Sequence, residues 1–411
     1  MAHARAGTPA GDGTRAGDTM TRILVAFDKF KDALTAQAAG EAAAESLRAL
    51  HPAWQVELAP LADGGEGFAR ILTGAAGGRL RSARVCGPRG IPLTAEFGLV
   101  PVGAIPSAAR AQLRVASTAG ADASVAVIEM ALASGLALLP QIARDPWQTT
   151  TQGTGELMRV AIAEGAVALL LGVGGSATHD LGLGALGALG FACVTAEGIA
   201  VAPPIPAHWK RIVRIEGRSN GTIPPVSIAC DVTNPLLGLR GAAAVYGPQK
   251  GLRSEDRAAL EEQSERLARM LCAHCERAAS LMDVAGAGAA GGIAFGLMAA
   301  LDAQLLPGFD LVSAWLDLET KLARADIVIT GEGRFDESSL EGKGPGAVAA
   351  RALALGKPVY VFAGQVTASA REGLSLHAIT PAGTPLAQAL REAATNLERT
   401  VSRVFSTVSL P

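Results

Sequence analysis

The chain has 411 residues, of which 49% are hydrophobic, so it can bury two cores or one core with a large insertion. Its net charge of −2 and aromatic content of 4% supply neither the basic surface nor the stacking side chains that nucleic-acid binding needs. These values exclude nucleic acid as the expected partner.

Residues 1–20 are mostly small, polar or charged, and we expect them to form a disordered N-terminal extension without the apolar core of a signal peptide. The apolar run 284–301 is rich in glycine and alanine and is flanked by aspartates, which indicates a buried helix rather than a membrane span. The close cysteine pair Cys272 and Cys275 fits one side of a helix better than a metal site. We therefore expect a reduced, cytoplasmic enzyme with no membrane partner.

The first predicted strand, 23–27, is followed directly by Asp28, Lys29 and Lys31, before a helix that begins after Thr35. Ligands of open α/β sheets bind at the carboxyl ends of the strands. The position therefore suggests functional roles for Asp28 and Lys31, while a merely solvated Lys29 remains plausible.

A short strand at 56–58 precedes a turn that contains Asp63 and Glu66 among three glycines. A plain turn needs only one Asp-Gly pair, so two carboxylates here are unusual. Glycines let the backbone approach a ligand closely and direct its N–H groups at an anion, so this turn is a candidate binding loop.

Short strands are predicted at 79–85, 95–100 and 125–130, with 103–123 as a mobile surface excursion. A buried strand at 167–171 then leads into the glycine-rich turn 172–180 and a helix that extends to residue 190. This order favours a phosphate or carboxylate held at a helix N-terminus. The candidate residues of the turn are Gly174, Gly175, Ser176, Thr178 and Asp180.

The remaining candidates follow two later strands and one turn. A strand at 226–230 precedes Asp231 and Asn234, and a glycine- and proline-containing turn carries Lys250. A buried strand at 327–329 precedes a loop with two carboxylates and a lysine, a combination that suits Mg²⁺ and phosphate oxygens. These three residues are Glu332, Asp336 and Lys343.

No stretch has the spacing of a standard P-loop. Two stretches, 182–187 and 286–291, satisfy G-x-G-x-x-G, but neither has a strand right before it or an acidic residue about 20 residues further on. A dinucleotide-dependent oxidoreductase is therefore a weaker alternative.

Seven motifs in order resemble the bacterial type-1 glycerate kinase family: FDKFKDAL, ADGGEG, GVGGSATHD, CDVTNPL, YGPQKG, GAGAAGG and ITGEGRFD…GK. The resemblance implies an α/β protein with two domains: a Rossmann-like parallel-sheet domain formed by both chain ends, and an inserted mixed α/β domain. The expected boundaries are 21–66 with 289–411 for the first domain and 67–288 for the second.

The resemblance also implies transfer of the ATP γ-phosphate to D-glycerate, at the 2-hydroxyl, by a monomer or homodimer. The residues themselves predict a Mg²⁺-dependent site in the cleft between the domains, because both chain ends and the inserted segment contribute to it. We expect Lys31 and Lys343 to neutralise phosphate, and Asp180 or Asp336 to act as the base. Asp231 and Glu332 are the first candidates for the metal, and the other candidates are expected to bind substrate or ATP. Two alternatives remain open, a non-catalytic sensor of a phosphorylated metabolite and formation of 3-phosphoglycerate.

Overall fold

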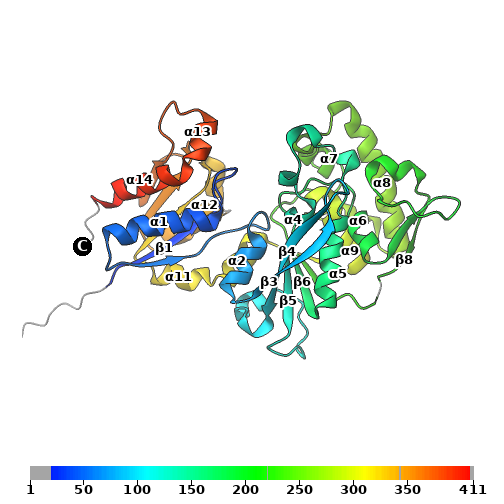
Figure 1. The fold of residues 1–411 in the computed structure, drawn as a ribbon, viewed down its shortest axis with the longest axis horizontal. Coiled ribbons are helices and arrows are strands. Elements are labelled where there is room, and N and C mark those ends of the chain that lie inside the picture. The colour runs from blue at the N-terminus through cyan, green and yellow to red at the C-terminus, as the bar shows by residue number, and fades with distance from the viewer. Residues whose placement is uncertain (1–19, 220, 342–343, 408–411) are drawn as a thin grey trace, which may run out of the picture.

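The computed structural model describes residues 20–219, 221–341 and 344–407, which form two groups of helices and strands (Figure 1). In these residues the two larger sheets have five and six strands, and helices accompany both. The prediction of an α/β fold is therefore confirmed. Residues 1–19, which make up most of the expected N-terminal extension, lie outside the described residues.

The five-stranded sheet is parallel throughout and has the order β15-β13-β11-β1-β2. The strand β2 lies on one side of β1, and β11, β13 and β15 follow one another on the other side. The direction in which strands are added therefore reverses between β1 and β11. In doubly wound sheets, this reversal opens a crevice at the carboxyl ends of the strands. The strands are β1 (Arg22–Phe27), β2 (Gln55–Leu58), β11 (Ile327–Gly331), β13 (Val359–Ala363) and β15 (Leu374–Ala378).

Helices cover both faces of this sheet, because its central strands are apolar on both sides. On one face α1 (Ala36–Leu50) packs beside α14 (Ala393–Phe405) over a core that includes Phe27 and Phe362 (Figure 1). The Thr35 hydroxyl accepts a hydrogen bond from the amide of Ala38 and so caps the start of α1. On the other face lie α11 (Leu318–Arg324) and α12 (Gly344–Ala354).

The six-stranded sheet is mixed and has the order β10-β9-β6-β5-β4-β3. Its first four strands in this order run parallel, whereas β3 and β4 form an antiparallel hairpin and β4 pairs antiparallel with β5. The strands are β3 (Arg79–Cys86), β4 (Pro92–Pro101), β5 (Ser124–Glu129), β6 (Ala166–Gly172), β9 (Val226–Ala229) and β10 (Gln304–Leu306).

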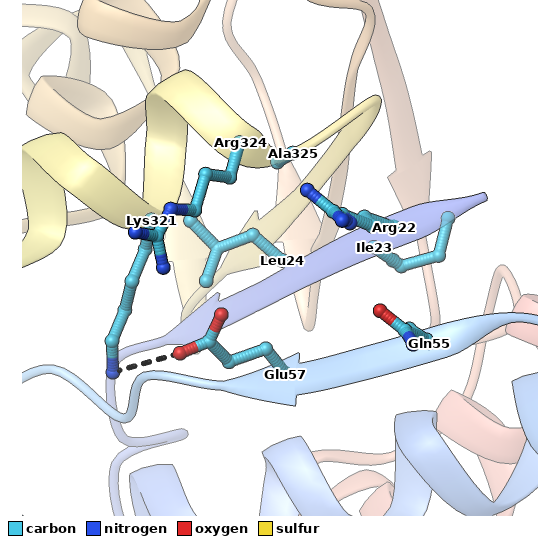
Figure 2. A pocket seen from close by; sticks show the side chains of 8 residues that line it. All are labelled: Arg22, Ile23, Leu24, Gln55, Glu57, Lys321, Arg324 and Ala325. Atoms are coloured by element: carbon cyan, nitrogen blue, oxygen red, sulfur yellow. Dashed lines mark ion pairs between the residues drawn. The ribbon is translucent and has the colours of Figure 1, made fainter. Parts of the chain in front are cut away.

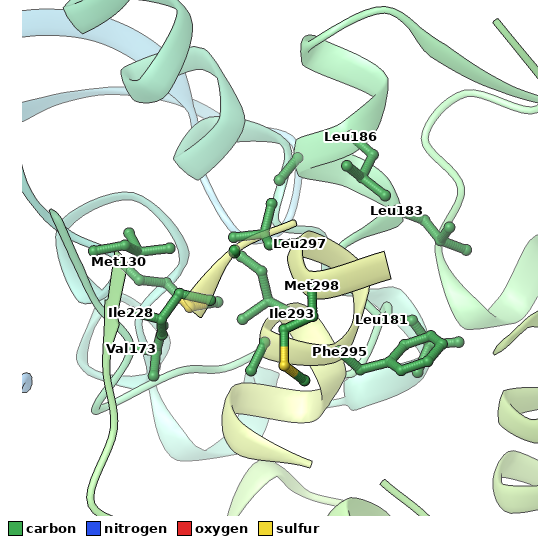
Figure 3. Packing of buried hydrophobic residues seen from close by; sticks show 14 of the residues in the cluster. Met130, Val173, Leu181, Leu183, Leu186, Ile228, Ile293, Phe295, Leu297 and Met298 are labelled. Atoms are coloured by element: carbon green, nitrogen blue, oxygen red, sulfur yellow. The ribbon is translucent and has the colours of Figure 1, made fainter. Parts of the chain in front are cut away.

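One face of this sheet carries a large apolar core, in which Ile228 and Val173 face Ile293 and Leu297 (Figure 3). Its helices are α5 (Gln152–Ala163), α6 (Leu183–Ala188), α8 (Arg257–His274) and α9 (Ala289–Leu301). On the opposite face lie α2 (Phe68–Ala75) and α10 (Gly308–Trp315). The Nε1 of Trp315 in α10 donates a hydrogen bond to the carbonyl of Leu72 in α2 at 2.9 Å. That second core continues to Leu24 and Val328 of the five-stranded sheet, so apolar contacts join the two sheets.

Shorter α-helices and strands, together with nine 3₁₀ helices, make up the remaining regular structure of the described residues. These short α-helices and strands are α3 (Ser107–Arg110), α4 (Ala131–Ser134), β7 (Phe191–Val194), β8 (Arg214–Gly217), α7 (Ala242–Tyr246), β12 (Arg334–Phe335), β14 (Gln365–Val366) and α13 (Leu386–Arg391). Across the described segments, no helix combines the length and the apolar character that crossing a membrane requires.

Two features differ from the sequence-based expectation. The boundary expected at residue 289 precedes α9 and β10, yet both elements lie with the six-stranded sheet, because β10 pairs with β9 and α9 fills its core. Residues 103–123 are not only a surface excursion, since Ile105, Ala109 and Leu113 are buried in the core shared by the two sheets. A domain division after β10 would follow the sheets more closely, and the division itself stays a prediction.

Candidate active site

Lys29 lies at the centre of a cluster of carboxylates. Its Nζ is 3.8 Å from Oδ1 of Asp28, the first residue after β1, and its amide donates to the same oxygen at 2.7 Å. Burial lowers the pKa of Lys29, but the charges of Asp28, Asp63, Glu66 and Glu129 outweigh this effect and raise it above the ordinary lysine value. The lysine is therefore held in its charged form by carboxylates that follow β1 and β2 of the five-stranded sheet and by Glu129 at the end of β5.

Two carboxylates of this cluster titrate near neutral pH. Burial, together with the charges of Asp63 and Glu66, raises the pKa of Asp28 to about 6, although Lys29 opposes the change. Burial raises the pKa of Glu129, the last residue of β5, to about 7. The Glu129 carboxylate is 2% exposed and accepts a hydrogen bond from the amide of Ala69 in α2 at 3.3 Å. Such perturbed carboxylates are typical of functional sites.

Glu332 extends the cluster along the edge of the five-stranded sheet. It follows β11, next to Asp28 after β1, and burial raises its pKa to about 7. The charges of Asp28 and Asp336 raise this pKa further, while the Ser339 hydroxyl and Lys29 oppose the change. Carboxylates therefore meet where the strand order reverses, as predicted for the ends of β1 and β11.

The two glycine-rich turns contact each other. The amide of Gly174 donates to the carbonyl of Gly64 at 2.9 Å, and a Cβ added at Gly174 would lie 2.6 Å from the Cα of Gly65. Gly64 adopts a positive φ of 96°, and the carboxylate of Asp63 accepts from the amide of Gly65 at 3.2 Å. Glycine is thus needed here because two backbones approach closely.

Asp180 is fully buried and accepts hydrogen bonds around its whole carboxylate. The donors are the amide and hydroxyl of Thr151 at 2.7 and 2.9 Å, the amides of Gly182 and Gly184 at 3.1 and 3.2 Å, and the Thr150 hydroxyl at 3.4 Å. This geometry fits a carboxylate that fixes the turn before α6 better than one that removes a substrate proton. The amides of Gly182 and Gly184, at the start of α6, already donate to this carboxylate. These amides are therefore not free to bind the anion that was predicted at this helix N-terminus.

Lys250 is buried behind the same turn. Its Nζ donates to the hydroxyl of Ser176 at 2.9 Å and to the carbonyl of Thr178 at 2.7 Å, and its side chain is 2% exposed. Burial lowers its pKa to about 7, although the charge of Asp180 opposes the change. Lys250 therefore supports Ser176 and the turn, and its burial separates it from direct contact with a ligand.

Asp231 and Asn234 stabilise neighbouring backbone. The Asp231 carboxylate accepts from the amides of Gly308 and Phe309, at 2.8 and 3.0 Å, at the start of α10. Asn234 donates from Nδ2 to the carbonyl of Arg240 at 2.7 Å and accepts from the hydroxyl of Tyr246 at 2.6 Å. The charges of Asp28 and Asp336 raise the pKa of Glu332, so these carboxylates act on one another electrostatically.

The other predicted residues lie at the outer edge of the site. The carboxylate of Asp336 accepts from the hydroxyl and amide of Ser338 at 2.5 and 3.0 Å and pairs with Arg334 at 3.3 Å. The Ser338 hydroxyl has the largest effect and lowers the pKa of Asp336, which makes it a weak base. Lys31 is exposed, and Lys343 lies outside the described residues.

A cavity of about 700 Å³ opens at the carboxyl edge of the five-stranded sheet, a volume typical of small-molecule sites. Its lining comes from the residues after β1, β11, β13 and β15 and from α13. The polar part of this lining consists of Asp28, Lys29, Lys31, Asp32, Glu332, Arg334, Gln365, Thr380 and Thr384.

A smaller hollow of about 310 Å³ lies between β1, β2 and α11 (Figure 2). Lys321 and Glu57 form an ion pair of 3.3 Å across it, and Arg22 and Arg324 complete its charged lining. None of the residues predicted to act in the site lines this hollow, whereas Asp28, Lys31 and Glu332 line the larger cavity.

The carboxylate cluster suits Mg²⁺. In the part of the chain that the structure describes, no group of three or more His, Cys, Asp or Glu residues is arranged as a complete metal site. Mg²⁺ usually takes one or two carboxylates and completes its coordination with water and substrate phosphates. Burial first, and neighbouring carboxylates second, raise the pKa values of Asp28 and Glu332, and a bound cation would offset both effects.

Sequence reasoning gave too little weight to Lys29 and missed Glu129. Both lie where the rule that identified Asp28 applies, because Glu129 is the last residue of β5 and Lys29 is the second residue after β1. The predicted strand 125–130 ended one residue beyond Glu129. The charge of each residue acts on the pKa of the other, across the junction of the two sheets.

Comparisons with known proteins agree with one family. The model of the glycerate kinase family matches residues 23–409. A Bacillus subtilis (strain 168) protein named glycerate kinase is 36% identical over 398 residues, which cover 95% of this chain and 98% of the relative. An Escherichia coli (strain K12) protein named glycerate 2-kinase is 36% identical over 352 residues, covering 84% and 86%.

A crystal structure named as a candidate glycerate kinase 2, from Salmonella typhimurium LT2, superposes with a TM-score of 0.74. It is 35% identical, and the match covers 94% of this chain and 98% of that chain. The motifs, the fold and these similarities agree: the chain belongs to the glycerate kinase family and is an ATP-dependent kinase.

Proposed function

We propose that this enzyme transfers the γ-phosphoryl group of ATP to the 2-hydroxyl of D-glycerate, giving 2-phosphoglycerate and ADP in a Mg²⁺-dependent reaction. The reaction takes place in the cleft between the two sheets, where the charged end of the 700 Å³ cavity, at Lys29, meets the two glycine-rich turns. The observation that carries the proposal is Lys29, which lies 3.8 Å from Asp28 and is held in its charged form by carboxylates that follow β1 and β2 and by Glu129 at the end of β5.

In this proposal the lysines of the site bind the phosphates and a carboxylate holds the metal. Lys29 and Lys31 neutralise the phosphate oxygens, because a loose transition state spreads negative charge over them. Glu332 would hold Mg²⁺, and the metal when bound would supply positive charge against the phosphate oxygens. Lys343 stays a candidate for a third cation at the same loop.

Asp28 is our candidate for the proton acceptor. Its pKa of about 6 leaves it ionised at neutral pH while still basic enough to accept a proton, and it is half-buried beside Lys29. The 2-hydroxyl gives its proton to the Asp28 carboxylate, its oxygen forms a bond to the γ-phosphorus, and the bond to the β–γ bridging oxygen breaks. ADP leaves with the negative charge of that oxygen. The earlier candidates Asp180 and Asp336 are less suited, because the first is enclosed by donors and the second is a weakened base.

The glycine-rich turns and Ser176 are proposed to bind D-glycerate. Ser176 lies on the turn that meets the Asp63–Glu66 loop, and its hydroxyl accepts from Lys250, so its own proton is directed elsewhere. Closure of the cleft around both substrates would exclude water from the γ-phosphorus. We further propose that the enzyme works in the cytoplasm as a monomer or homodimer, in keeping with five free cysteines.

The test is to incubate the protein with ATP, Mg²⁺ and D-glycerate, and to follow ADP by a coupled assay and the product by ³¹P NMR. We expect stoichiometric ADP and 2-phosphoglycerate, with turnover abolished by excess EDTA and restored by Mg²⁺. Formation of 3-phosphoglycerate would correct the position of transfer. Binding of D-glycerate or phosphoglycerate without ADP formation would favour the sensor alternative, and full turnover in EDTA would contradict the metal requirement.

A further inference from the structure

We propose that the α13 side of the 700 Å³ cavity binds the nucleoside of the phosphoryl donor, with its base against Leu386 and Leu390. The inference rests on the proposed function, in which ATP is the donor. It assigns a ligand to the α13 side of the cavity, away from the charged cluster. This side carries none of the residues that the motifs identified.

The position follows from the topology of the sheet. The cavity is lined by residues that follow β1, β11, β13 and β15, and it includes the point between β1 and β11 where the strand order reverses. Doubly wound sheets bind nucleotides in the crevice at this reversal. The charged end of the crevice contains Asp28, Lys29 and Lys31, so the phosphates would lie there and the nucleoside beyond them.

The wall of the cavity that α13 forms is apolar and open to solvent. Leu386 of α13 is 72% exposed, and α13 contains no buried residue. Leu390, Ala389 and the buried Ile379 continue the same wall. A flat aromatic base would remove this surface from water, and such burial is the main favourable term in most small-molecule sites.

Polar side chains also line the cavity near its apolar wall. Thr380 follows β15, Thr384 precedes α13, and Gln365 lies in β14, and all three line the cavity. Their hydroxyl and amide groups can pair with the ribose and the edge of the base. The cavity thus has a charged end, where Lys29 and Lys31 lie among carboxylates that Mg²⁺ would offset, and an apolar end at α13. The phosphates with their Mg²⁺ would lie at the first end and the base at the second.

The other candidate for nucleotide binding is already occupied by the protein. In the glycine-rich turn before α6, the amide of Gly174 donates to Gly64, and the amides of Gly182 and Gly184 donate to Asp180. These groups are not available to a phosphate. The crevice beside α13 is therefore the better site for the donor.

The experiment compares two ligands that differ in the nucleoside. Binding of MgADP and of magnesium tripolyphosphate is measured by calorimetry for the wild type, Leu386→Asn and Ile91→Asn. Ile91 is a matched control, because its side chain is also 72% exposed but lies in the β3–β4 hairpin. Asparagine adds no charge that could repel phosphate.

We expect Leu386→Asn to weaken MgADP binding at least tenfold, to change tripolyphosphate binding less than twofold, and to raise KM for ATP without changing KM for D-glycerate. Ile91→Asn should leave all four quantities unchanged, and both variants should melt near the wild type. Unchanged MgADP binding to Leu386→Asn, or an equal loss for both ligands, would overturn the inference. If the wild type fails to phosphorylate D-glycerate but shows this pattern, the inference holds and the proposed function fails.

Discussion

The amide of Gly174 donates a 2.9 Å hydrogen bond to the carbonyl of Gly64, and this contact joins the loop after β6 to the loop after β2. Because Gly64 lies between Asp63 and Glu66, the contact sets the position of the carboxylates that surround Lys29. A strand of the six-stranded sheet and a strand of the five-stranded sheet thus contribute to one cluster through a backbone contact.

Gly174→Ala should disrupt this contact, because the new Cβ would lie 2.6 Å from the Cα of Gly65 and 2.9 Å from its nitrogen. We expect kcat/KM to fall at least ~30-fold, the scale of displacing a positioned group by a fraction of an ångström or more. Steady-state kinetics with D-glycerate and ATP give the value.

Gly187→Ala is the matched control, since a Cβ at Gly187 in α6 meets nothing within 4 Å. It should keep full activity and gain about 0.5–1 kcal/mol in unfolding free energy, because alanine loses less backbone freedom on folding than glycine. Equal activity of the two variants would show that the contact between the turns does not position the site.

Asp180→Asn should destabilise the fold. The amide NH₂ would face donors such as the Thr151 and Gly184 amides, and a buried hydrogen-bond network would lose its acceptor. We expect a loss of about 2–4 kcal/mol in unfolding free energy, measured by denaturant titration. The exposed Asp122 serves as control, and Asp122→Asn should stay within about 0.5 kcal/mol of the wild type. A stable Asp180→Asn protein with kcat reduced ~100-fold would restore Asp180 as the catalytic base.

Lys250 should make stability depend on pH. Burial lowers its folded-state pKa to about 7, while the unfolded chain restores an ordinary lysine, so the unfolded state binds more protons between about pH 7 and 10. The unfolding free energy should therefore rise with pH across this window, by at most about 1.4 kcal/mol per pH unit.

Lys250→Met removes the titrating amine and keeps most of the volume of the side chain. Urea titrations at pH 7, 8 and 9 should show the wild type gaining stability relative to Lys250→Met as the pH rises. Parallel pH curves for the two proteins would mean that Lys250 is charged in the folded state and has a partner that holds the charge.

The sequence predicted those parts of the site that follow from one strand at a time. Asp28 and Glu332 come directly after strands whose apolar runs are long enough to recognise, and parallel pairing then brings their positions together. The same rule would have identified Glu129, but the strand was placed one residue too far along the chain.

The remaining features depend on contacts between distant residues. The role of Asp180 depends on an amide 29 residues earlier in the chain, which no local pattern reveals. The position of β10, a three-residue strand, is set by its pairing with β9 and not by its own composition. Sequence patterns therefore predicted the fold class and the charged residues at the carboxyl edge of the five-stranded sheet. Only the geometry distinguishes a carboxylate that holds the backbone, such as Asp180, from those that line the cavity, such as Asp28 and Glu332.

The most direct test of the site compares kcat for Lys29→Met and Lys31→Met, with ADP formation from ATP and D-glycerate as the readout. Lys29 lies within the carboxylate cluster, whereas Lys31 is exposed at the wall of the cavity. We expect Lys29→Met to lower kcat at least ~100-fold and Lys31→Met chiefly to raise KM for ATP, with both proteins folded as judged by their melting. A Lys29→Met enzyme with near-normal kcat would contradict a phosphoryl-transfer site built around Lys29.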